Sequence, residues 1–182
     1  MRILTIYFFV SVFTEAVGYL CFLLKWNNMP LFHIHTALEC GFLTIVFYQL
    51  LNTIQGKSIL SLTFIGFVSY MMIDLTFFSS LFEPNSTSKT VESAIIILLC
   101  AVFLFELSKS RHYAKLYKRA YSILSIGLLT YFIGTILVSY YSYRLMGEKP
   151  YEIWMIHGIL NILLNILYTV VIWNSVGLRK IK

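Results

Sequence analysis

Residues 31–40 read LFHIHTALEC, so two histidines and a glutamate lie in a stretch that is otherwise apolar enough to cross a bilayer. His35 and Glu39 are four residues apart, and side chains at this spacing share one face of a helix. His33 lies about 200° around the same helix from His35, so the two histidines cannot chelate one ion. A carboxylate beside a histidine can bind a cation and exchange protons. The spacing therefore predicts joint chemistry for His35 and Glu39, and for His33 a separate contact with a lipid headgroup or a loop.

Polar and ionisable side chains recur at helical spacing in three further apolar stretches. An ionisable group in the hydrocarbon core costs about 2.5–3.5 kcal/mol and normally faces the protein interior. At a rise of about 1.5 Å per residue, the acids and histidines all lie between one helix end and the membrane midplane. We therefore expect one buried polar layer shared by four helices. Its candidate residues are Glu15, His35, Glu39, Tyr70, Asp74, Trp154, His157, Asn161 and Asn165.

The composition requires that lipid solvates most of the chain. Of the 182 residues, 59% are hydrophobic and 12% are charged, whereas an ordinary soluble domain carries about 25% charged residues. A helix of about 20 predominantly apolar residues crosses a bilayer. The sequence therefore predicts an all-α polytopic membrane protein, a bundle of six transmembrane helices that forms one domain over residues 1–182. The predicted spans are 3–24, 30–51, 59–82, 91–108, 121–143 and 151–174.

Two of the predicted helices offer little chemistry. The fourth is nearly featureless between Ala94 and Phe105, so we expect it to face lipid. The fifth carries Gly127 and Gly134, and small residues at this spacing favour close packing of membrane helices. Its role is therefore predicted to be structural.

The basic residues predict the orientation of the helices. With both termini in the cytoplasm, ten of the 14 Lys and Arg residues lie inside and four outside, as the positive-inside rule requires. Lys89 is one of the four outer residues. The basic loop Lys109–Arg119 is interpreted as a topology determinant that touches anionic lipid, and not as a nucleic-acid site. A cytoplasmic protein partner at this loop and a homo-oligomer are further hypotheses.

The favoured functional hypothesis is transport or sensing. The polar layer would bind or conduct a cation, a proton or a small polar ligand, with Glu39 and Asp74 as carriers and His35 and His157 tuning them. We expect no cofactor and no metal in this case, and a non-enzymatic role is favoured. The three cysteines lie within apolar segments, and no disulfide framework is expected.

Three alternatives remain open. The polar layer could be a set of hydrogen bonds between helices that only specifies their packing. It could instead hold a divalent metal in an intramembrane lipid hydrolase, although seven-span ceramidase-like hydrolases have a second histidine where this chain has Asn161. The chain could also be an accessory or pore-forming membrane partner of a cytoplasmic complex.

The opening of the second predicted helix, NMPLFHIHT at residues 28–36, is followed by Glu39. Glu15 precedes Gly18 in the first helix, and the last helix has the form Trp154-x-x-His157-x-x-x-Asn161. In these features the chain resembles small multi-pass inner-membrane proteins of unknown function found in Bacteroidota-type bacteria. The resemblance implies a bacterial inner-membrane location and no particular activity.

Overall fold

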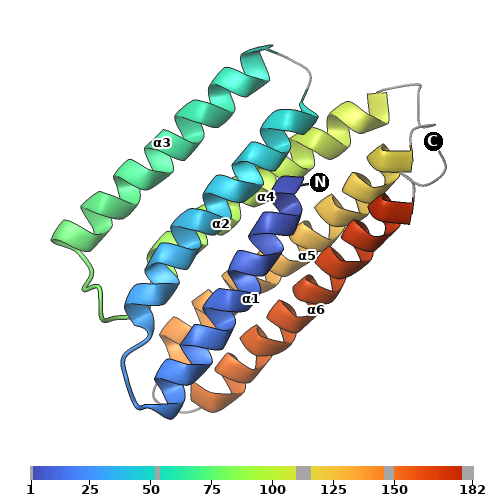
Figure 1. Ribbon diagram of the computed structural model, residues 1–182. Helices are drawn as coiled ribbons and strands as arrows, with labels where there is room; N and C mark the ends of the chain where they lie inside the picture. The colour runs from blue at the N-terminus through green and yellow to red at the C-terminus, as the bar shows by residue number, and fades with distance from the viewer. Residues whose placement is uncertain (1, 52–53, 110–115, 146–149, 178–182) are drawn as a thin grey trace. The chain divides into compact units, whose positions relative to one another are not determined.

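The described part of the chain is entirely helical. The computed structural model describes residues 2–51, 54–109, 116–145 and 150–177, with side chains at all of these except 54–57, 59, 109, 116–119, 142–145, 150–154, 157 and 174–177. The all-α prediction is confirmed for these residues, which contain no strand. Figure 1 shows the helices α1 (Arg2–Leu23), α2 (Met29–Leu50), α3 (Ile54–Phe77), α4 (Ser86–Lys109), α5 (Leu116–Leu145) and α6 (Pro150–Gly177).

Each helix overlaps one predicted span, but the boundary between the third and fourth helices differs. Helix α3 ends at Phe77, whereas the predicted span continued to residue 82. Helix α4 begins at Ser86 instead of residue 91, because the Lys89 N–H donates a hydrogen bond to the Asn85 carbonyl at 2.9 Å and so closes the first turn. The polar residues 86–90 are therefore helical, which matters for the site described below.

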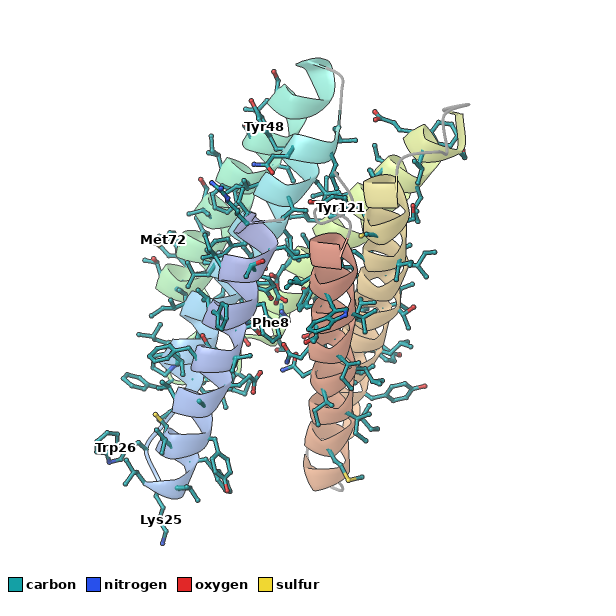
Figure 2. All side chains as sticks on the ribbon, turned by 45° about the vertical axis from the view of Figure 1, so that its right-hand side comes forward. Phe8, Lys25, Trp26, Tyr48, Met72 and Tyr121 are labelled. Atoms are coloured by element: carbon teal, nitrogen blue, oxygen red, sulfur yellow. The ribbon has the colours of Figure 1, made fainter. Side chains whose placement is uncertain are left out.

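Five helices are long and apolar enough to cross a membrane: α1, α2, α4, the Leu60–Phe77 part of α3 and the Ala120–Tyr141 part of α5. In α6 the described apolar segment is shorter, Gly158–Trp173. Large apolar side chains are exposed on these helices, among them Phe13 (68% exposed), Leu62 (68%) and Met72 (60%). Figure 2 shows Met72 on the surface of α3 and Trp26 beyond the end of α1. Such surfaces are stable in lipid and costly in water.

The chain divides into two compact units, residues 2–92 and residues 93–182. The first unit contains α1, α2, α3 and the first turns of α4, and the second contains the remainder of α4 with α5 and α6. Each unit is described by itself, and the single domain predicted for residues 1–182 stays a prediction.

Helices α1 and α2 form an antiparallel pair and are connected by a tight turn. Lys25 has a positive φ of 57°, and the N–H groups of Lys25 and Trp26 donate to the carbonyls of Phe22 (3.1 Å) and Cys21 (2.8 Å). This is the Schellman arrangement, which ends a helix and usually has glycine at the left-handed position. Pro30 then lies in the first turn of α2, where its missing N–H costs nothing.

In the second unit, α5 and α6 pack closely through glycines. A Cβ atom added at Gly127 would lie 2.0 Å from Leu167 Cδ2, and one added at Gly134 would lie 2.9 Å from Leu160 Cδ1. The leucine side chains of α6 therefore fill the space that a larger residue on α5 would need. The predicted role of Gly127 and Gly134 in close packing is confirmed.

The prediction that the fourth helix faces lipid is wrong. Glu92, Ser93, Ile96 and Cys100 are each 0% exposed, and the buried stripe continues along α4 at helical spacing. The opposite face is open, with Leu98 64% exposed. Both faces of the central part of α4 are apolar in sequence, so hydropathy alone cannot distinguish a helix surrounded by lipid from one that is half buried in protein.

Candidate functional site

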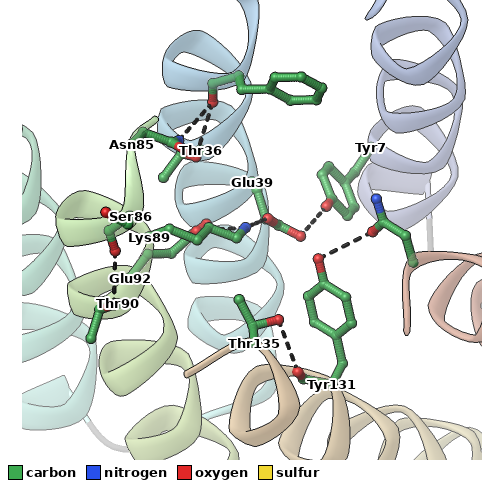
Figure 3. A network of polar contacts seen from close by, with 12 residues as sticks. Tyr7, Thr36, Glu39, Asn85, Ser86, Lys89, Thr90, Glu92, Tyr131 and Thr135 are labelled. Atoms are coloured by element: carbon green, nitrogen blue, oxygen red, sulfur yellow. Dashed lines mark hydrogen bonds and ion pairs between the residues drawn. The ribbon is translucent and has the colours of Figure 1, made fainter. Parts of the chain in front are cut away.

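Glu39 is the centre of a buried polar cluster in the unit formed by residues 2–92. It projects from α2, and its side chain is 1% exposed. The Tyr7 hydroxyl of α1 donates a hydrogen bond to Glu39 Oε1 at 2.5 Å. The Lys89 ammonium of α4 donates to the other carboxylate oxygen, Oε2, and forms an ion pair with it. Figure 3 shows Tyr7 and Lys89 approaching Glu39 from opposite sides, so one carboxylate joins three helices.

Lys89 also pairs with a second buried acid. Its Nζ atom lies 2.8 Å from Glu92 Oε2, one turn further along α4. The Glu92 side chain is 0% exposed and that of Lys89 is 12% exposed. Oε1, the other carboxylate oxygen of Glu92, is buried and has no hydrogen-bond partner within the described part of the chain. One ammonium thus serves two carboxylates, and the cluster of Glu39, Lys89 and Glu92 has a formal charge of −1 when all three groups are ionised.

A third acid reaches the same part of α4 from α3. Asp74 is 5% exposed, and its Oδ2 atom accepts a hydrogen bond from the Ser88 hydroxyl at 3.1 Å. Ser88 is adjacent to Lys89 in sequence and lies four residues before Glu92, on the same helix face. The first two turns of α4 therefore receive carboxylates from α2 and from α3. Tyr70, one turn before Asp74 on α3, is half-buried.

The two histidines of α2 occupy different environments, as their spacing predicts. His33 is 1% exposed, and its Nε2 atom donates to the Glu83 carbonyl at 3.1 Å in the loop between α3 and α4. The predicted loop contact of His33 is therefore confirmed. The His35 ring lies one turn from Glu39, with its centroid 6.4 Å from that of Tyr7. Its Nε2 atom is buried and has no hydrogen-bond partner among the described residues.

The loop before α4 is fixed to α2 by a hydrogen-bonded asparagine. Asn85 Nδ2 donates to Thr36 Oγ1 at 2.6 Å and to the Phe32 carbonyl at 3.2 Å. These bonds connect the start of α4 to the face of α2 that carries Glu39, three residues beyond Thr36 (Figure 3). They hold Lys89 one turn from Asn85, at the level of the acid that it pairs with.

The remaining predicted residues are placed as follows. Glu15 is half-buried on α1, eight residues or about 12 Å along the helix from Tyr7. In the second unit, the Tyr131 hydroxyl of α5 donates to Asn161 Oδ1 of α6 at 3.1 Å, and Asn165 Oδ1 is buried. The side chains of Trp154 and His157 lie outside the described residues.

Sequence reasoning missed three members of the cluster: Tyr7, Lys89 and Glu92. Lys89 was assigned to an outer loop and Glu92 to the end of a lipid-facing helix, because both precede the apolar part of α4. The available signal was Asn85, a residue type preferred at the N-cap of a helix, which would have placed Ser88, Lys89 and Glu92 on one helix. Tyr7 had no comparable signal in an apolar segment.

The described residues include no group of three or more His, Cys, Asp or Glu side chains arranged to hold a metal ion. Comparisons with protein-family models, with curated proteins and with solved structures give no match to this chain. The fold and the site therefore define a class, a helical protein with apolar membrane-length helices and a buried charged cluster, and the function is inferred from the cluster itself.

Proposed function

We propose that this chain is a multi-pass membrane protein that binds a proton or a small cation at the Glu39–Lys89–Glu92 cluster, in transport or in sensing. The supporting observation is the charge imbalance of the cluster: two carboxylates, 1% and 0% exposed, share one ammonium. A buried charge without a counter-charge costs several kcal/mol even after the protein relaxes. One additional positive charge, carried by a proton or another cation, makes the cluster neutral.

Packing alone accounts poorly for this composition. Hydrogen bonds between membrane helices average about 0.6 kcal/mol in double-mutant cycles, and a Glu39–Lys89 pair would already connect α2 to α4 without net charge. Glu92 adds a second buried acid to the same ammonium. Ionisable residues inside membrane segments commonly mark ion pathways and proton relays, and the half-buried His35 beside Glu39 is a further group that can carry a proton.

The proposal includes the membrane arrangement predicted from the sequence. It comprises six spans with both termini in the cytoplasm, and residence in a bacterial inner membrane, consistent with the resemblance noted above. The five membrane-length helices support an integral membrane protein, and the positive-inside bias supports this orientation. A homo-oligomer or a cytoplasmic partner at the basic loop 109–119 is compatible with the proposal.

Flux measurements in proteoliposomes test the proposed function. The purified protein is reconstituted, an inward gradient of NaCl, KCl or NH4Cl is imposed, and internal pH and cation content are followed with fluorescent indicators. Ion-dependent or proton-dependent signals are expected from the unmodified protein and are expected to fall at least about tenfold in Glu39→Gln and Glu92→Gln. Glu106→Gln, an acid-to-amide change on the same helix as Glu92, is the matched control.

A sensor would not show flux, so binding is measured in parallel. Isothermal titration calorimetry in detergent reports whether H⁺, Na⁺, K⁺ or NH4⁺ binds and whether the two glutamine variants lose that binding. The proposed function is rejected if the unmodified protein binds none of these ions and carries none of them, or if the Glu39 and Glu92 variants behave like Glu106→Gln.

A further inference from the structure

The geometry of the cluster identifies the type of ion more closely. The Lys89 ammonium lies between two acids, paired with Glu39 Oε2 and 2.8 Å from Glu92 Oε2. An ammonium group is a compact monovalent cation that interacts through its charge and three rotatable donors. The space that it occupies is therefore already shaped and charged for a monovalent ion of ammonium size.

Lys89 differs from its two partners in exposure. Its side chain is 12% exposed, while those of Glu39 and Glu92 are 1% and 0% exposed. The ammonium is carried on a flexible four-carbon stem, whereas the carboxylate of Glu39 is also held by Tyr7. Withdrawal of the lysine toward its more exposed side would break its two ion pairs and would leave the carboxylates in place.

We propose that Glu39 and Glu92 form a binding site for one monovalent cation of ammonium size, NH4⁺ or K⁺, and that the Lys89 ammonium is its built-in occupant. An arriving ion replaces the ammonium charge for charge, so the pair of acids is not left without a cation during the exchange. The cluster then keeps its formal charge of −1, which a proton neutralises as in the proposed function. Glu92 Oε1, buried and without a hydrogen-bond partner among the described residues, supplies a further ligand atom that Lys89 does not use. This inference rests on the proposed function and specifies its substrate class.

Chemical rescue tests the inference. Lys89→Met removes the ammonium and retains an unbranched side chain of similar length. Its thermal midpoint in detergent is compared in NH4Cl, KCl, NaCl, CaCl2 and choline chloride at equal ionic strength and fixed pH. We expect NH4Cl and KCl to raise the Tm of Lys89→Met by about 5 °C or more relative to choline chloride, as ligand binding to the native state does.

The unmodified protein provides a second, quantitative expectation. Its tethered ammonium competes with added ions at a high effective concentration, so the salt concentration at half effect should be at least about tenfold higher than for Lys89→Met. Lys25→Met makes the same change at an exposed lysine outside the cluster and should acquire no specific response to NH4Cl or KCl. The double variant Lys89→Met/Glu92→Gln should lose the response of Lys89→Met, because only one acid remains.

Each other outcome contradicts the inference. Equal Tm values of Lys89→Met in NH4Cl, KCl and choline chloride would show that protons alone satisfy the two acids, and a larger rise in CaCl2 would indicate a divalent site. Failure of Lys89→Met to fold even when it is expressed and purified with NH4Cl would also overturn it. These results can be separated from the proposed function, which is tested by flux and binding in the unmodified protein and fails or survives independently of Lys89→Met.

Discussion

The shared ammonium of Lys89 predicts that the charged residues of the cluster contribute unequally to stability. Glu92→Gln leaves a neutral Glu39–Lys89 pair, and the carbonyl of the introduced amide can still accept from the ammonium. The free energy of unfolding should therefore change by no more than about 2 kcal/mol, the range for one imperfectly satisfied buried polar group. Lys89→Met leaves two buried acids without a base, and removal of one partner from a buried ion pair costs about 3–5 kcal/mol.

For a chain of this size, 1 kcal/mol corresponds to about 2–4 °C in Tm. The expected loss for Lys89→Met in choline chloride is therefore about 6–20 °C, and that for Glu92→Gln is at most about 8 °C. Intrinsic tryptophan fluorescence during heating in detergent measures both variants. Glu39→Gln provides a third point, because it also leaves one acid for Lys89 but replaces the acceptor of the Tyr7 hydroxyl with an amide oxygen.

The formal charge of the cluster predicts the order of stability of the three variants. The cluster has a formal charge of 0 in Glu92→Gln and in Glu39→Gln, and of −2 in Lys89→Met, against −1 in the unmodified chain. If Glu92→Gln lost as much stability as Lys89→Met, the ion pair between Lys89 and Glu92 would itself be required for folding. The cluster would then be a structural network, and the interpretation of Glu92 as the uncompensated acid would be refuted.

Three further variants test the fold around the site by the same thermal assay. Tyr7→Phe removes the donor to buried Glu39 and should lower the free energy of unfolding by about 1.5–3 kcal/mol, the range for a hydrogen bond to a charged group. If the stability did not change, water would have to replace the tyrosine hydroxyl at the Glu39 carboxylate, and that carboxylate would not be buried. Gly127→Ala should destabilise by about 1–3 kcal/mol through overpacking against Leu167, whereas Gly66→Ala, with nothing within 4 Å of the added atom, should not. Lys25→Gly should stabilise by about 1 kcal/mol, because glycine adopts a φ of 57° without strain, and equal stability of the two would show that the Schellman turn is unstrained.

Much of the fold could be predicted from the sequence because a membrane helix needs a long apolar segment. The six segments correspond to the six helices, and helical spacing also placed His35 with Glu39 and separated His33 from His35. The glycines of α5 could be assigned to close packing for a similar reason, since a missing side chain permits close approach wherever the neighbouring helix lies.

The partners of Glu39 could not be predicted by the same means. Periodicity shows which residues share a face of one helix, but it does not show which residue of another helix lies opposite. A prediction from hydropathy places the start of α4 at its first apolar residue and therefore excludes Lys89 from the helix. In the structure, the hydrogen bond from the Lys89 N–H to the Asn85 carbonyl shows that the helix starts earlier. The network of Tyr7, Lys89 and Glu92 depends on tertiary contacts that a single sequence does not contain.

The energetic role of Glu92 separates function from packing in this cluster. Replacing a buried ion pair with apolar residues of similar volume is often neutral or stabilising by about 1–4 kcal/mol, so packing alone would favour an apolar side chain at this fully buried position. Glu39 has Tyr7 and Lys89 as partners, whereas Glu92 has a share of one ammonium and an oxygen without a hydrogen bond in the described part of the chain. A cation that enters the cluster lowers the free energy most where compensation is poorest, and this position is the Glu92 carboxylate.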